Sequence, residues 1–131
     1  AAVGRGVRAM LTDPALGTYV LATDGSEVLG QIQLAPLFDD WHDGIVWWAD
    51  GLSVPTQNRR FGTAGALVRH VLSAAAADPR VKAVRGELPD DAENHEALRH
   101  FYERLGFRRT GVVMERSAVP DGIPIVVRQA G

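Results

Sequence analysis

Hydrophobic residues recur at two different spacings along the first half of the chain. Val3, Val7 and Met10 stand three or four positions apart, as on one face of a helix, and Asp13-Pro14 ends the pattern. The residues that follow alternate between apolar and polar, which is typical of half-buried strands. The sequence therefore predicts a short first helix and then three strands, over 18–23, 27–34 and 45–54.

The second half alternates between helical and extended patterns. Apolar residues from Ala64 to Ala75 trace one face of a helix that begins after Gly62 and ends at Asp78-Pro79. The remaining expected elements are a strand over 81–88, a helix over 94–105 and two last strands over 108–116 and 123–128. Strand–helix–strand passages alternating with hairpins imply a mixed α/β sheet flanked by helices.

Length and composition narrow the function classes. The 131 residues have room for one domain, so we expect 1–131 to form a single unit. The absence of cysteine excludes disulfides, thiolate metal sites and a cysteine nucleophile. A formal net charge of −2 gives no basic field for nucleic acid, and no apolar run approaches a membrane span. We expect a cytoplasmic protein with neither nucleic acid nor membrane as partner.

The segment between the third strand and its helix is rich in glycine and arginine. A helix N-terminus presents free N–H groups and a partial positive charge, so it can hold a phosphate. Gly62 and Ala64 permit a close approach, and Arg59 and Arg60 can add charge-assisted hydrogen bonds. The alternative is a glycine-rich helix start with two solvated arginines. The spacing fits neither a P-loop nor a dinucleotide fingerprint.

The later helix carries a second pattern with a good structural explanation. Asn94 is a natural N-cap, Gly106 a natural left-handed residue after the helix, and Phe107 a hydrophobic closure for that end. Tyr102 stands on the apolar face, where an aromatic residue is usually part of the core.

Both patterns, in this order, resemble the two signatures of the GNAT superfamily of N-acetyltransferases. Arg59, Gly62 and Ala64 match the motif Gln/Arg-x-x-Gly-x-Gly/Ala, and 94–107 match Asn-x-x-Ala-x-x-x-Tyr-x-x-x-Gly-Phe. The resemblance covers roughly 16–116 and implies a mostly antiparallel central sheet and acetyl-coenzyme A (acetyl-CoA) as co-substrate. The residues that it implies for cofactor binding are Leu52, Ser53, Val54, Arg59, Arg60, Phe61, Gly62, Thr63, Ala64 and Asn94.

The resemblance also implies a mechanism of direct attack by an amine. An alkylammonium must lose a proton, and a departing thiolate is better expelled when it is protonated. Tyr102 corresponds to the family tyrosine that protonates the sulfur. Asp50 stands where many members carry a glutamate that acts as a base through water, although it could instead cap a bulge at Gly51 or pair with an arginine. Glu87 is the reserve candidate for the base.

Other polar clusters give weaker indications. The acidic, aromatic loop 38–44 could attract a cationic amine, or it is simply a solvated hairpin loop. His95 and His100 stand five positions apart, off the spacing of a metal pair, so we expect no metal. Of the neighbouring Trp47 and Trp48, one should face the core and the other the acceptor site.

Two questions stay open at this point. The acceptor is a small-molecule or peptide amine, unless the chain is a non-catalytic acyl-CoA sensor or a dimeric interaction module that uses 108–128. Family sheets begin with a strand beside 18–23 and a further helix, and both are missing here. We expect the outer edge of strand 18–23 to be covered by preceding residues, by a partner chain in a possible homodimer, or by helix 3–11, because an unpaired edge invites aggregation.

Overall fold

Four strands form one sheet in the order in which they occur along the chain. The computed structural model describes residues 1–57, 62–89 and 94–118 of the 131. Strands β1, β2 and β3 are antiparallel neighbours, and β4 lies parallel to β3. The elements in chain order are α1 (Ala2–Thr12), β1 (Thr18–Asp24), β2 (Glu27–Asp39), β3 (Gly44–Ser53), α2 (Thr63–Ala77), β4 (Val81–Gly86) and α3 (His95–Arg104).

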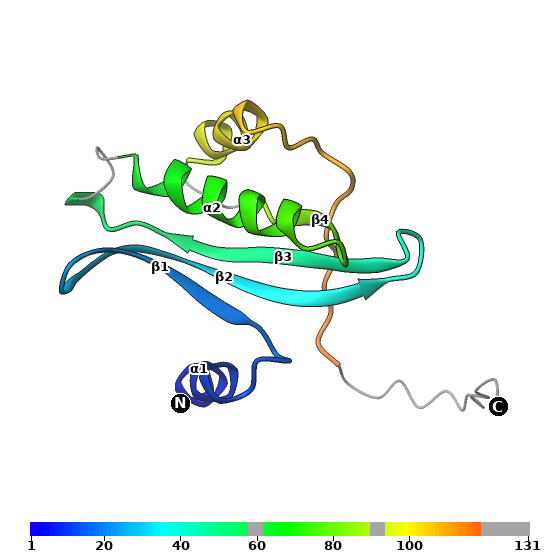
Figure 1. Cartoon of the computed structure of the whole chain (residues 1–131), viewed down its shortest axis with the longest axis horizontal. Coiled ribbons are helices and arrows are strands. Elements are labelled where there is room, and N and C mark those ends of the chain that lie inside the picture. Colours follow the sequence, from blue (N-terminus) through cyan, green and yellow to red (C-terminus); the bar gives the residue numbers. More distant parts are fainter. Residues whose placement is uncertain (58–61, 90–93, 119–131) are drawn as a thin grey trace.

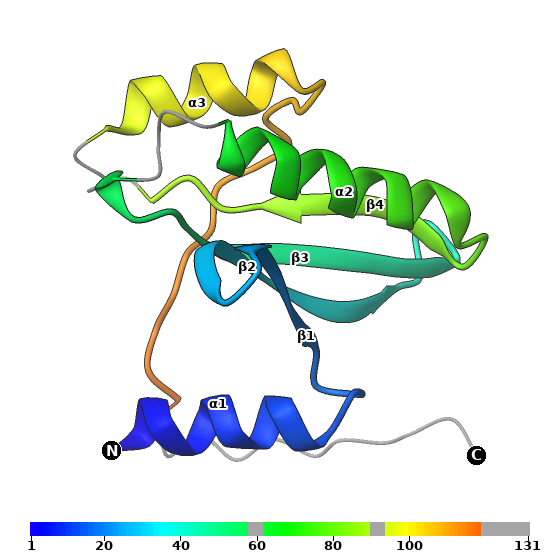
Figure 2. The same cartoon turned by 60° about the vertical axis from the view of Figure 1, so that its left-hand side comes forward.

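The helices lie on both sides of the sheet. Figures 1 and 2 show α2 and α3 above it and α1 below it. The parallel β3–β4 pair requires a crossover connection, which α2 provides. This mixed, mostly antiparallel sheet with flanking helices confirms the fold class that the sequence predicts.

The core lies between the sheet and α2. Ile32 and Leu34 point from β2 toward α2, whereas Gln33 between them points to the other face. The helix contributes its apolar stripe, in which Leu67, Val68 and Val71 are buried. Gly30 lets the start of α2 approach closely, because a Cβ there would lie only 3.0 Å from the Thr63 methyl group.

Strand β2 runs five residues further than the sequence predicts. Residues 35–39 lie beyond the predicted strand, and among them Pro36 cannot donate a ladder hydrogen bond. In the structure Pro36 pairs with Trp47, and Asp39 pairs with Gly44. The prediction was wrong because the partner strand, which lies further along the chain, carries the ladder past the proline.

The expected strand over 108–116 is also wrong. Residues 107–118 leave α3 as chain that belongs to no strand, and Figures 1 and 2 show them passing from the α3 side toward the α1 side. Their expected hairpin partner, 123–128, lies outside the described residues. A strand requires a hydrogen-bonded neighbour, and none of the described strands pairs with 108–116.

The outer edge of β1 has no strand beside it among the described residues. Helix α1 approaches the beginning of β1, where the Met10 methyl group would lie 3.1 Å from a Cβ at Gly17. None of the residues of α1 is buried, and Val3 and Leu11 stay exposed. Helix α1 therefore does not cover the edge of β1 with its apolar face. Cover of this edge by preceding residues or by a partner chain stays a prediction.

Candidate active site

A cavity of about 350 Å³ opens where β3 ends, α2 begins and α3 passes. Five of the residues expected at the cofactor lie on its wall, namely Leu52, Ser53, Val54, Ala64 and Asn94. The wall is completed by Ala97, Leu98 and Phe101 of α3, which sequence reasoning assigned only to the apolar side of that helix. These three residues are identified only by the position of α3 over the end of β3. No local sequence pattern contains this long-range arrangement.

The cavity exists because β3 and β4 separate. Their parallel ladder ends at Ala49 and Gly86, whereas β3 continues to Ser53 along β2 only. Two β3 residues, Gly51 and Leu52, oppose the single residue Ile32 of β2, which is the expected bulge. Gly51 adopts a φ of 61°, in the region that favours glycine. On the β4 side, the last β3 residues therefore leave the sheet ladder and line the cavity.

The first turn of α2 borders this cavity. Gly62 precedes the helix with a φ of 67°, and the Gly62 carbonyl accepts the hydrogen bond from Ala66 N–H at 3.0 Å. The first turn contains no acidic residue, so no carboxylate in that turn offsets the partial positive charge of its N–H groups. The side chain of Thr63 is buried toward Gly30, so only its backbone is available to a ligand. Arg59, Arg60 and Phe61 lie outside the described residues.

One further cation lies at this helix start. The Arg69 guanidinium folds back over Gly65, so that its Nη2 would lie 3.0 Å from a Cβ there. Sequence reasoning did not single out Arg69. The available signal was the spacing of four between a glycine and an arginine, which places both on the same helix surface.

Tyr102 lies in the core beside the end of β4. Its side chain is 8% exposed, and its ring packs edge-to-face against Phe101 and Phe107 with centroids 5.2 Å apart in each pair. The Cζ atom would lie 3.7 Å from a Cβ at Gly86. Burial, and then the negative charge of Asp50, raise the pKa of Tyr102 above its ordinary value, so its hydroxyl stays protonated at neutral pH.

The two candidate bases, Asp50 and Glu87, come directly after the last residue pair of the β3–β4 ladder. Ala49 pairs with Gly86, so Asp50 and Glu87 are the next residues of two adjacent strands, and both are exposed. Asp50 Oδ1 accepts a hydrogen bond of 2.8 Å from Gly51 N–H, so the carboxylate does cap the bulge. A carboxylate has two oxygens, so this bond is compatible with a second partner such as water.

Trp47 and Trp48 lie on opposite faces of the sheet. The acidic loop lies away from the cavity. Trp47 packs against the core cluster, which places Trp48 on the opposite face of the sheet, the face of Asp50. The turn 40–43 joins the opposite ends of β2 and β3, about ten residues of strand away from the cavity. The turn is therefore an exposed hairpin turn rather than a wall of this site.

In the described part of the chain, no three acidic or histidine side chains gather in a way that could hold a metal ion. None of the helices in that part is long and apolar enough to cross a membrane.

Comparison with known proteins identifies the family. The sequence model of the acetyltransferase (GNAT) domain matches residues 15–109, whereas no curated protein sequence matches the chain. A possible acetyltransferase from Clostridium difficile 630 is 24% identical with a TM-score of 0.78, over 91% of this chain and 76% of that one. An integron cassette protein from the mobile metagenome of Cole Harbour Salt Marsh is 26% identical with a TM-score of 0.71, over 88% and 69%.

A third structure carries a more specific name. An aminoglycoside acetyltransferase from an uncultured soil metagenomic sample is 21% identical with a TM-score of 0.72, over 88% of this chain and 74% of that one. Identity at this level shows a shared fold, and the domain match extends over most of the chain. The chain belongs to the GNAT superfamily of acetyltransferases, whose members transfer acyl groups.

Proposed function

We propose that this protein transfers an acetyl group from acetyl-CoA to a primary amine of a small molecule or peptide. The observation that carries the proposal is the cavity between the end of β3, the start of α2 and α3. Two features that such a co-substrate needs lie around it, a strand end that has left the β4 ladder and a positive helix start, and Tyr102 follows the lining residue Phe101 in α3.

The described residues fit the long, polyanionic shape of the co-substrate. The last residues of β3, Leu52 and Ser53, suit the amide-bearing pantetheine arm, since a strand backbone offers both N–H and C=O groups, and Val54 lines the cavity beside them. The first turn of α2, assisted by Arg59 and Arg60, suits the pyrophosphate. Asn94 lines the same cavity and would contact the same arm. The bound co-substrate supplies an acetyl group activated as a thioester.

Proton movement falls to two side chains of this protein. The amine nitrogen forms a bond to the carbonyl carbon, and the carbon–sulfur bond breaks. Asp50 takes the proton of the ammonium through a water molecule, because aspartate is too short for most direct contacts at this position. Tyr102 gives its proton to the sulfur and is protonated again by the second proton that the nitrogen loses as the amide forms, while its raised pKa favours the protonated form. Glu87, the first residue after β4, is the alternative base.

The acceptor approaches from the face of the sheet that α2 and α3 leave open. Asp50 and Trp48 project there from β3, and an exposed carboxylate beside an aromatic ring favours a cationic amine. The similarity in fold to an aminoglycoside acetyltransferase supports an amine acceptor as a class.

The alternative function is a non-catalytic sensor that binds acyl-CoA. Such a sensor needs the cavity but neither the acid nor the base. An intact Tyr102 together with an acid at position 50 favours catalysis, because a sensor needs to keep neither.

Free-thiol release from acetyl-CoA tests the proposal directly. The purified protein is assayed against polyamines, aminoglycosides, amino acids and short peptides, with titration calorimetry of coenzyme A in parallel. We expect micromolar binding and acceptor-dependent thiol release with at least one class of primary amine. Binding without release across the panel would favour the sensor, and an absence of binding would contradict both functions.

A further inference from the structure

The turn between β2 and β3 presents large apolar side chains to solvent. Trp41 is 94% exposed, Phe38 63% and Leu37 49%. An aromatic residue can bury about 150–250 Å² in an interface, so this cluster is costly to leave in water. The turn lies beside the C-terminal end of α2, at the far end of the sheet from the start of α2 (Figure 1).

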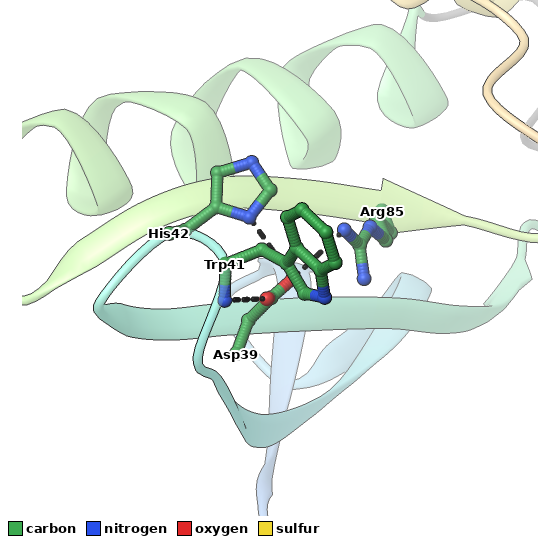
Figure 3. Close-up of polar contacts among 4 residues, drawn as sticks. All are labelled: Asp39, Trp41, His42 and Arg85. Atoms are coloured by element: carbon green, nitrogen blue, oxygen red, sulfur yellow. Dashed lines mark hydrogen bonds and ion pairs between the residues drawn. The ribbon is translucent and has the colours of Figure 1, made fainter.

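The turn is held in one conformation by a single carboxylate. Asp39 Oδ1 accepts a hydrogen bond of 2.9 Å from Trp41 N–H, and Asp39 Oδ2 lies 3.0 Å from His42 Nδ1 and 3.0 Å from Arg85 Nη2 (Figure 3). Arg85 belongs to β4, two strands away from Asp39. The side chain of Asp39 is only 12% exposed. Trp41 is therefore exposed on a preorganised support, which lowers the entropy cost of binding.

A hollow lies at the same end of the molecule. Its volume is about 360 Å³, and Phe38, Ile45 and Pro79 supply apolar wall. Lys82, Arg80 and Asp43 also line it, and Arg80 is already paired with Asp78 at 3.0 Å, so Lys82 supplies the positive charge that a partner can meet. The turn carries the exposed carboxylate of Asp40 next to Trp41. Thus an aromatic protrusion beside Asp40 and an apolar hollow beside Lys82 occupy one surface.

We propose that a second copy of this chain covers this surface, with Trp41 of each copy entering the hollow of the other. A two-fold pair requires a self-complementary patch, and here shape and charge both complement themselves. Asp40 in the turn of one copy meets Lys82 beside the hollow of the other, which sets the orientation. The cofactor cavity lies at the other end of β3, about 30 Å away for ten residues of strand, so each copy keeps its site open.

Sedimentation equilibrium of the whole chain from micromolar to near-millimolar concentration tests the proposal. We expect a monomer–dimer equilibrium that weakens as salt is added. Trp41→Ser should raise the dimer Kd at least about 30-fold, the size of a hot-spot loss. Met114→Ser is the matched control, because Met114 is equally exposed at 93% but lies in the chain after α3, and its Kd should equal that of the wild type.

Charge reversal tests the occupant. Asp40→Lys and Lys82→Glu should each weaken the dimer about tenfold, and the double variant should recover most of the loss, since the two signs are then exchanged. Circular dichroism and coenzyme A binding should stay unchanged in every variant. A wild type that stays monomeric at all concentrations overturns the proposal. A dimer that Trp41→Ser leaves intact, or single reversals whose losses simply add, also overturns it.

Discussion

Tyr102 shows how one side chain can serve the core and the chemistry at once. Its ring lies in the core cluster between two aromatic rings, and its hydroxyl is close enough to Asp50 for that charge to raise its pKa. The apolar face of its helix already indicated a core position for Tyr102 in the sequence, and its burial agrees with this. The coupling to Asp50 depends on the β3–α3 contact, which no local pattern contains.

Replacing Tyr102 by phenylalanine removes one hydroxyl and almost no volume. We expect the fold and the coenzyme A affinity of Tyr102→Phe to stay close to the wild type, because the ring packing persists. Turnover should fall about 10²–10⁴-fold, the usual contribution of a general acid. Thiol-release kinetics with calorimetry on the same sample separate the two effects. An unchanged rate would return Tyr102 to a purely structural role.

The charge of Asp50 should be visible in the titration of Tyr102. Asp50→Asn removes a negative charge that opposes the tyrosinate, so the pKa of Tyr102 should fall, while burial still holds it above the ordinary value near 10. Ultraviolet absorbance of tyrosinate measures this in a Tyr19→Phe background, where Tyr102 is the one tyrosine left of two. Adding Tyr102→Phe should abolish the signal. A midpoint that does not move would mean that Asp50 and Tyr102 are not coupled.

At the scale of elements, the site depends on how closely α2 packs on β2. Gly30 has no side chain at the point where the helix begins, and Val54 and Leu67 pack on either side of that point. The close approach brings the positive end of α2 to the end of β3. Both walls of the cavity thus depend on a glycine that lies outside either signature motif.

Gly30→Ala should therefore disturb both stability and binding. The new Cβ would lie 3.0 Å from Val54 Cγ2 and 3.0 Å from Thr63 Cγ2, so the helix start must shift. We expect the free energy of unfolding to fall by about 1–3 kcal/mol, as for other overpacked sites, and the coenzyme A Kd to rise. Urea unfolding and calorimetry measure the two quantities.

Gly6→Ala provides the control in α1. No heavy atom lies within 4 Å of its added Cβ, so the helix should gain about 0.5–1 kcal/mol and the coenzyme A Kd should not change. Equal behaviour of the two variants would contradict the packing argument.

For the whole molecule, the cavity links three elements that are distant along the chain. A ligand that binds there stabilises the folded state by mass action, by about 2.7 kcal/mol when its concentration is 100 times Kd. We expect coenzyme A at that excess to raise the melting temperature by roughly 10 °C. Differential scanning fluorimetry measures this shift.

Gly62→Glu should lose the shift, because a carboxylate at the start of α2 repels the phosphates and opposes the helix dipole. Gly62→Gln is the matched control. It imposes the same strain at a φ of 67° without the charge, so it should keep most of the shift. If coenzyme A stabilised Gly62→Glu as much as the wild type, the proposal that this helix start binds the phosphates would be wrong.

Much of this protein is determined by its sequence alone. The helices begin and end within two residues of the predicted positions, because apolar spacing and breaks such as Asp78-Pro79 act locally. Asn94 stands at the predicted N-cap position of α3, but its side chain makes no capping hydrogen bond. Five residues assigned to the cofactor from the family resemblance line one cavity, since motif residues follow fixed elements of a shared fold.

Only the tertiary structure decided the rest. Pro36 stays within a strand because β3 continues the ladder past it, and 108–116 form none because no described strand pairs with them. Thr63 turns into the core because Gly30 leaves room for it. Each outcome depends on a neighbour that is distant in sequence or on the exact approach of two surfaces. Periodicity records which side of an element is apolar, whereas the partner that meets that side is chosen by packing across the whole chain.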